Sequence, residues 1–264
     1  MHTGAYRYRD FAIISGAIEE YGSYVTQIME EFGIPFFLDT TKNILLHPFL
    51  EFVRSLLQVI EDNFSEEAMF RYLRCGLSQI SEDEIDLLEN YVLAAGIRGK
   101  KKWEARFIYT THEVTEEDLE ALNELRIRVM EPFLELTAVF RKKGATVREC
   151  TTALYQFIVS LQIEQQLKYR ENQYKEAKDL AKAKEYAQIY RIVMDILDKM
   201  ATLLGDEVMD ISEYAKVLEA GFEAAKVGVI PGGYDCVMIG DIERTRLDDI
   251  KVLFIVGVND GIVP

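Results

Sequence analysis

A cluster of basic side chains surrounds Trp103, the only tryptophan of the chain. Two glycines, Gly96 and Gly99, bound the segment, which favours a flexible loop. Lys and Arg neutralise phosphates and an aromatic ring can stack on a base, so this composition would suit contact with a nucleic acid. The alternative is a solvated loop with Trp103 packed beneath it. The basic members of the cluster are Arg98, Lys100, Lys101, Lys102 and Arg106.

A second pair of cations, Arg244 and Arg246, lies between the last two apolar runs of the sequence. Both guanidinium groups could contact a phosphate backbone. Carboxylates in the same connection compete for them as ion-pair partners: Asp241, Glu243, Asp248 and Asp249. A ligand role and local ion pairing therefore both remain open for this pair.

The sequence contains no motif of a catalytic, cofactor or metal site. The patterns GxxxxGK[ST], GxSxG and HExxH are absent, and no GxGxxG follows a predicted strand. The glycine-rich turn at 257–261 lacks the Lys and Ser/Thr that bind phosphate and magnesium. Paired carboxylates such as Glu82 and Glu84 fall in the first turns of predicted helices, where they complement the helix dipole. We therefore assign no catalytic, cofactor-binding or metal-binding residue.

The cysteines and histidines are scattered. We interpret Cys75, Cys150 and Cys236 as buried free thiols, because they show no CxxC spacing and no clustered histidines. His47 precedes Pro48 and an apolar helical stripe, which favours a helix-entry residue over a ligand contact.

Composition limits the classes of function. Of the 264 residues, 49% are hydrophobic, which is ample for a core. The formal net charge of −15 argues against an all-round polyanion-binding surface, so any nucleic-acid contact must be local. Neither a run of roughly 20 apolar residues nor a signal-peptide pattern is present. We expect a cytoplasmic protein that makes no membrane contact.

Short apolar runs at the two ends predict a parallel sheet. Residues 10–15 and 34–38 predict strands on either side of a helix at 18–32, which Gly33 caps. Near the other end, the segments around 237–239 and 252–256 predict two further strands. The second is a continuous apolar run, as expected for a strand covered on both faces. We also expect a piece of something larger, in which missing strands leave an exposed sheet edge.

The middle of the chain is predicted to be helical. Helix starts are indicated by side-chain acceptors, most with an acid three residues later: Ser65, Ser81, Thr115, Thr146 and Asp210. The longest helix is predicted over 175–204, ending at Gly205. The fold class is therefore mostly α with a small α/β part. Residues 1–47 begin the α/β domain, 48–226 form a helical insertion, and 227–264 supply the return strands.

Both ends resemble a known helicase fold. Residues 8–14, YRDFAII, followed by a helix and by GIPFF at 33–37, resemble the start of the second RecA-like domain in superfamily I helicases of the UvrD and Rep type. The closing segment 252–264, VLFIVGVNDGIVP, resembles the strand and turn by which that chain returns from its insertion. The resemblance implies a partial RecA-like sheet split by a helical insertion similar to subdomain 2B.

A closer resemblance is to the B subunit of the AddAB-type (RexAB) helicase-nuclease. It is carried by GDIERTR at 240–246 and GVNDG at 257–261, with weaker support from RGKKKW at 98–103 and QIYR at 188–191. The resemblance implies that the parent protein is an ATP-dependent helicase and exodeoxyribonuclease subunit. It would act with the A subunit on double-strand breaks in recombinational DNA repair, using ATP, magnesium and an iron-sulfur cluster held outside these residues.

The sequence also departs from active helicases of this superfamily. Their T-x-H-x-x-K-G-L-E motif, which couples DNA contact to nucleotide hydrolysis, has no counterpart at 240–249, where neither the His nor the Lys-Gly pair occurs. We therefore expect an inactive segment that guides single-stranded or forked DNA and contacts the partner subunit. Arg244 and Arg246 are the first candidates for DNA contact, followed by Lys100, Lys101, Lys102 and Trp103.

Two other functions remain open. The segment could belong to an active ATP-driven motor, which ATP hydrolysis by the full-length subunit alone would favour. It could instead be a helical protein-interaction scaffold without DNA binding, which the acidic charge favours. The sequence does not discriminate between these alternatives.

Overall fold

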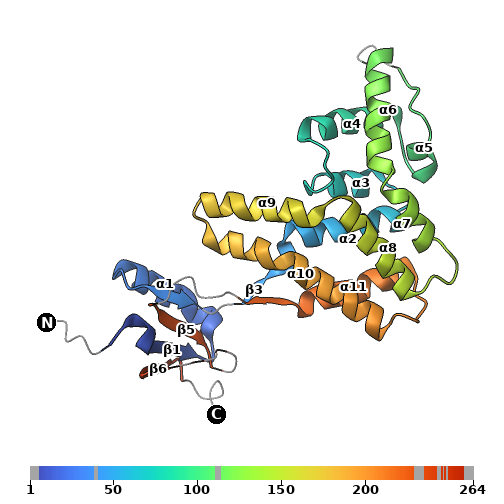
Figure 1. The fold of residues 1–264 in the computed structure, drawn as a ribbon. Coiled ribbons are helices and arrows are strands. Elements are labelled where there is room, and N and C mark those ends of the chain that lie inside the picture. Colours follow the sequence, from blue (N-terminus) through green and yellow to red (C-terminus); the bar gives the residue numbers. More distant parts are fainter. Residues whose placement is uncertain are drawn as a thin grey trace.

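The computed structural model describes residues 6–38, 41–110, 114–228, 235–242, 245, 247 and 249–258. A small sheet occupies one end of the molecule, and a larger group of helices occupies the other (Figure 1). This arrangement confirms the predicted fold class, mostly α with a small α/β part.

Four parallel strands form the main sheet, in the order β2-β5-β1-β6. They are β1 (Phe11–Ser15), β2 (Phe36–Leu38), β5 (Val237–Asp241) and β6 (Val252–Val256). Ile13 pairs with Ile239 on one side and with Phe254 on the other, so strands from both ends of the chain lie side by side. Helix α1 (Ile18–Glu31) connects β1 to β2, and a short 3₁₀ turn at Tyr8–Asp10 precedes β1. The β-α-β prediction is confirmed.

The prediction that the last strand is covered on both faces is wrong for this structure. Leu253, Phe254 and Ile255 are 45%, 51% and 49% exposed. Within the described residues β6 is an edge strand that pairs only with β1, and α1 packs against β1, β2 and β5 instead. The expected exposed edge is therefore present on this side of the sheet.

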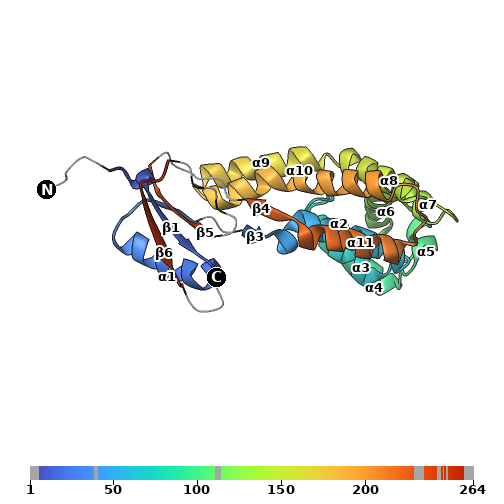
Figure 2. The same ribbon diagram turned by 90° about the horizontal axis from the view of Figure 1, so that it is seen from below.

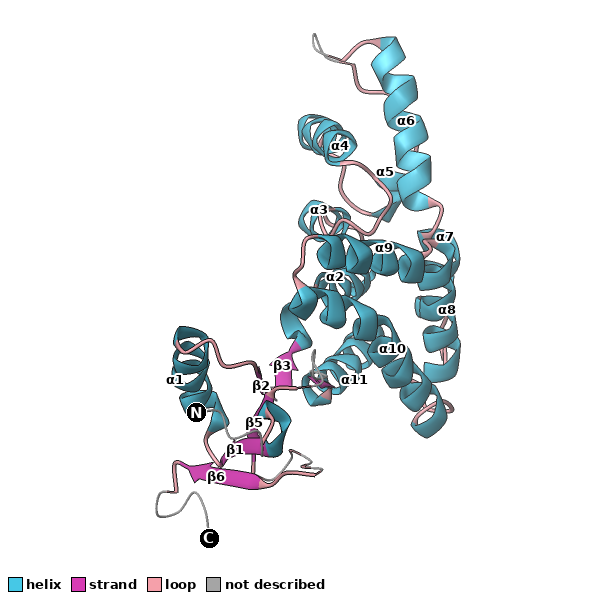
Figure 3. Cartoon of the chain, turned by 60° about the vertical axis from the view of Figure 1, so that its left-hand side comes forward, coloured by secondary structure: helices cyan, strands magenta, loops and turns pink. Residues whose placement is uncertain are grey.

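A short antiparallel ribbon lies where the chain passes between the sheet and the helices. It consists of β3 (Thr41–Asn43) and β4 (Lys226–Gly228), and β3 leads through a 3₁₀ turn at Ile44–Leu46 into α2 (Figures 2 and 3). The sequence did not predict these strands, because three-residue segments carry too little periodicity. The ribbon brings the start and the end of the helical segment together.

Ten helices make up the segment between the two strands of the ribbon, as far as the structure describes it. They are α2 (Pro48–Glu61), α3 (Glu66–Leu73), α4 (Glu82–Ala95), α5 (Lys100–Glu104), α6 (Glu116–Met130), α7 (Phe133–Phe140), α8 (Val147–Ser160), α9 (Ile163–Glu176), α10 (Leu180–Leu203) and α11 (Ile211–Ala224). Every predicted start signal caps a helix, and Ser81, Thr115, Thr146 and Asp210 form complete capping boxes. None of the described helices is long and apolar enough to cross a membrane.

The longest helix starts five residues later than predicted. Lys178 adopts φ 61°, and Asp179 caps the first turn of α10 by accepting a hydrogen bond from the Lys182 amide. The preceding residues belong to α9, which turns back to form an antiparallel hairpin with α10 (Figures 1 and 2). The charged run at 175–185 concealed this break, because Lys and Glu are good helix formers on both sides of it.

Most of the buried apolar side chains belong to the helical part. A run of aromatic rings fills its centre, with Phe52, Tyr72, Phe133 and Phe157 in mutual contact at centroid distances of 5.1–6.3 Å. The sheet has its own small core around Ile18, Val237 and Ile239. The two cores are separate, so the sheet and the helical segment are each stabilised mainly by their own contacts.

Candidate nucleic-acid interface

The basic segment around Trp103 folds as a short helix, and the predicted flexible loop is not found. Gly99 adopts φ 82°, a left-handed conformation that favours glycine, and α5 follows directly. The carbonyl groups of Trp103 and Glu104 accept hydrogen bonds from Arg126 Nη1 at 3.1 and 3.0 Å. These contacts fix the orientation of α5 against α6.

Trp103 is buried and does not present its ring to solvent. Its exposure is 0%, and its ring lies 6.2 Å from the ring of Phe70 and 6.2 Å from that of Phe107. Of the two sequence interpretations, packing beneath the surface is therefore the one found. Stacking on a base is not open to Trp103 in this conformation, which corrects its assignment as a DNA-contacting residue.

The three lysines remain at the surface but differ in their partners. Lys100 Nζ lies 3.4 Å from Glu104, and Lys102 Nζ donates to the Gly96 carbonyl at 2.7 Å. Lys101 is exposed. Exposed ion pairs of this kind contribute about 0 to 1 kcal/mol, so a phosphate group could replace the carboxylate beside Lys100 at little cost.

The neighbouring arginines face carboxylates. Arg106 forms an ion pair with Glu120. Arg98 lines a concavity of about 560 Å³ together with three acidic residues, Asp62, Glu66 and Glu67. A polyanion would therefore be attracted to the lysine end of the segment rather than to Arg98.

The second predicted basic pair, Arg244 and Arg246, lies outside the described residues. Nearby, Thr245 Oγ1 accepts a hydrogen bond from the Asp241 amide at 2.8 Å. Lys251, which directly precedes β6, forms an ion pair with Asp10 at 3.1 Å. Local ion pairing thus occurs around this connection, and DNA contact by Arg244 and Arg246 stays a prediction.

His47 is the helix-entry residue that the sequence predicted. Its Nδ1 accepts a hydrogen bond from the Phe49 amide at 3.1 Å, which caps α2, and its ring packs against Tyr186 of α10 at 4.5 Å. Burial, with a smaller contribution from the charge of Arg170, lowers the pKa of His47 to about 4. The neutral imidazole is therefore a structural element of the helical core, next to the ribbon.

The cysteines show no sign of a shared site. All three are free thiols; Cys150 is buried, and Cys75 and Cys236 are half-buried. Burial raises the pKa of each thiol, to about 11 for Cys150, which disfavours the thiolate form that binds metals. No group of three His, Cys, Asp or Glu side chains suited to a metal ion occurs within the described ranges.

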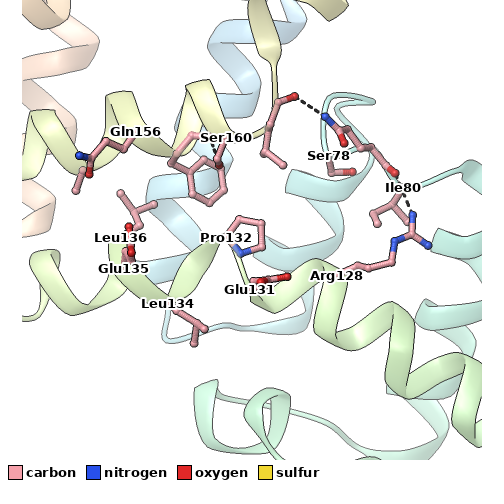
Figure 4. A pocket seen from close by; sticks show the side chains of 14 residues that line it. Ser78, Ile80, Arg128, Glu131, Pro132, Leu134, Glu135, Leu136, Gln156 and Ser160 are labelled. Atoms are coloured by element: carbon pink, nitrogen blue, oxygen red, sulfur yellow. Dashed lines mark hydrogen bonds between the residues drawn. The ribbon is translucent and has the colours of Figure 1, made fainter.

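The structure also contains a concavity that the sequence did not indicate. It encloses about 570 Å³ between α6, α7, α8 and the loop at 78–80 (Figure 4). Arg128 donates to Glu84 at 2.5 Å and to the Gln79 carbonyl, and Gln79, at φ 61°, donates from Nε2 to the Leu161 carbonyl at 2.6 Å. Because Glu131 and Glu135 also line it and Arg128 is already paired, this concavity does not fit a phosphate. The sequence gives no periodic signal for this concavity, because three separate segments of the chain assemble it.

The geometry defines a helical segment inserted in a small parallel sheet, with a lysine-rich surface at α5. Comparison of the sequence with known proteins finds similarity to helicase-nuclease subunits. The chain is 48% identical over 266 residues to the B subunit of the ATP-dependent helicase/deoxyribonuclease of Lachnoclostridium phytofermentans. Proteins of the same name from Clostridium novyi and Alkaliphilus metalliredigens are 40% and 38% identical to it. No family model matches the chain.

Each of these alignments covers 98% of the chain but only 22–24% of the relative. The chain is thus homologous to one segment of the B subunits of ATP-dependent helicase/deoxyribonucleases, as the sequence resemblance implied. It spans less than a quarter of the length of these relatives.

Proposed function

We propose that the chain is a segment of a helicase-nuclease subunit that guides DNA and contacts the partner subunit during ATP-dependent processing of double-strand breaks. The observation that carries the proposal is the 48% identity, along almost the whole chain, to the B subunit of a helicase/deoxyribonuclease. The name of that relative indicates DNA as substrate and a second subunit as partner, which we infer to be an A subunit.

The described residues support a guiding role rather than a catalytic one. Lys100, Lys101 and Lys102 concentrate positive charge on one short helix of a chain with net charge −15. Such a local patch attracts phosphates without making the whole surface bind nucleic acid. The contacts of α5 with α6 would hold the backbone of this helix in place while DNA passes.

An iron-sulfur cluster, which the sequence resemblance implies for the longer parent, does not fit the thiols of the described residues. The free thiols of Cys75, Cys150 and Cys236 lie in different elements and do not gather, so they do not suit an iron-sulfur cluster. We infer that ATP, magnesium and the cluster are held by other parts of the parent protein.

A salt titration of DNA binding tests this role. The variant Lys101→Ala leaves the Lys100 and Lys102 contacts in place and should weaken binding of single-stranded and forked DNA. Each lost phosphate contact should lower the slope of log K against log salt by about 0.7 on a single strand. Lys143→Ala, which removes another exposed lysine, is the matched control.

Two results would contradict the proposal. If the salt slope is unchanged in Lys101→Ala and in the triple alanine variant of Lys100, Lys101 and Lys102, then α5 makes no contact with DNA. In the complete helicase-nuclease, Arg244→Ala combined with Arg246→Ala should weaken engagement of the DNA strand. Unchanged DNA binding and processing would exclude DNA contact by these two arginines.

A further inference from the structure

One flank of α9 carries polar and aromatic side chains in two rows with helical spacing. Gln165, Tyr169 and Gln173 recur every four residues, and so do Gln166, Arg170 and Tyr174 in the row beside them. Together with Ala177 they line a groove of about 750 Å³, which we call the amide-tyrosine groove. None of its lining residues is Asp or Glu, although the chain contains 45 acidic residues.

The inner row is fixed by contacts to neighbouring elements. Gln166 Nε2 donates to the carbonyls of Leu77 and Leu161 at 3.1 and 2.8 Å, and Arg170 Nη2 donates to that of Gly76 at 2.7 Å. The ring of Tyr174 packs against Tyr186 at 5.2 Å. The inner row is therefore a rigid floor tied to the loop after α3.

The outer row is open to solvent. Tyr169 is 65% exposed, and Gln165 and Gln173, one helical turn to either side, are exposed as well. Successive members of the row stand about 6 Å apart along the axis of α9, because an α-helix rises about 1.5 Å per residue and they are four residues apart. This spacing exceeds the roughly 3.4 Å step of stacked bases in a duplex, so it suits bases that are splayed apart.

These side chains match the chemistry of single-stranded DNA. A tyrosine ring offers a stacking platform for any base, and glutamine amides offer both a donor and an acceptor to base edges. Positive charge lies nearby, with Arg170 in the floor and Lys182 Nζ 5.2 Å from the centre of the Tyr174 ring. Tyrosine and arginine are also enriched at protein interfaces, so a protein partner is the competing occupant, and the proposed DNA-processing role of the parent favours the nucleic acid.

We propose that the amide-tyrosine groove binds single-stranded DNA by its bases, with a base stacked on Tyr169 between Gln165 and Gln173. This site is separate from the lysines of α5, which would contact phosphates. The inference rests on the proposed function, since DNA as the ligand class comes from it. It adds a second contact surface, on the α9–α10 hairpin (Figures 1 and 2).

Fluorescence anisotropy with a labelled mixed-sequence single strand tests the groove in this chain. Tyr169→Ala should weaken binding roughly 5- to 150-fold, the range expected for loss of one base stack. Tyr169→Phe retains the ring and should bind almost as well as the unmodified chain. Tyr155→Ala removes a tyrosine that is 47% exposed on α8 and should leave binding unchanged. The salt slope should stay constant in all three variants, because no phosphate contact is lost.

The outcomes separate this inference from the proposed function. If the chain binds DNA and Lys101→Ala weakens binding but Tyr169→Ala does not, the groove is rejected and the guiding role of α5 stands. If Tyr169→Ala impairs only assembly with the partner subunit, the groove is a protein surface and the inference is rejected. If the chain binds no single-stranded DNA at low salt, the groove and the DNA-guiding role both fail.

Discussion

Single residues determine how this chain responds to pH, and His47 is the clearest case. The imidazole is 2% exposed, accepts a hydrogen bond from the Phe49 amide and packs against Tyr186. A proton on Nδ1 would remove that acceptor, and the charge would be buried near Arg170. The native structure therefore requires the neutral form of His47.

The free energy of unfolding should fall in acid because of this residue. His47 has a pKa of about 4 in the folded chain against about 6.5 when unfolded, so the unfolded state binds the proton more tightly. Its contribution is fully present above pH 6.5 and is lost as pH falls towards 4, to a total of up to about 3 kcal/mol. Urea unfolding at several pH values measures the slope.

The variant His47→Asn isolates the effect of this histidine. Asparagine is a good helix cap and does not titrate, so it keeps the role at the start of α2. Between about pH 6.5 and 4 the unmodified chain should lose up to about 3 kcal/mol of stability relative to His47→Asn, whatever the carboxylates contribute. Parallel pH profiles for the two proteins would show that His47 is protonated without cost.

His47 and Trp103 show what the sequence could and could not predict about the candidate site. The position of His47 before Pro48 indicated a helix entry, since local spacing determines a cap. The burial of Trp103 was left open, because it depends on Phe70 and Phe107 reaching the ring from other elements. Residues that act through neighbours distant in sequence are not identifiable from spacing alone.

Among the elements, the helix starts marked by a capping side chain were predicted correctly, but the start of the longest helix was not. Each start depends on one side chain that accepts a hydrogen bond within the next turn, and that signal is local. The break before α10 depends on a single left-handed residue, Lys178, in a sequence that favours helix on both sides. The three-residue strands of the ribbon depend on pairing across the whole insertion, which no local pattern records.

The cap of α8 gives a direct test at this scale. Thr146 Oγ1 accepts a hydrogen bond from the Glu149 amide at 3.3 Å, and Glu149 returns one by accepting from the Thr146 amide at 3.0 Å. Thr146→Ala removes the first contact and should lower the free energy of unfolding by about 1 kcal/mol. Thr146→Ser keeps the hydroxyl and should have little effect. Equal urea midpoints for Ala and Ser would show that the cap is not used.

The whole molecule combines an acidic surface with an exposed apolar sheet edge. Leu253, Phe254 and Ile255 of β6 are about half exposed on both faces, and the strand pairs on one side only among the described strands. Unpaired edges of this kind are templates for pairing with another chain.

This edge should make the isolated chain associate at high concentration. Phe254→Lys places a charge on the edge strand and should shift sedimentation towards monomer, because a buried unpaired ammonium group is costly in a sheet-to-sheet contact. The substitution also makes the net charge of −15 less negative, which would weaken general repulsion and favour association. A shift towards monomer would therefore point to the edge itself.

Val159→Lys, on an exposed position of α8, makes the same change in charge away from the sheet and should not reduce association. If both variants sediment like the unmodified chain, association through β6 is excluded, and the acidic surface is enough to keep the edge unpaired.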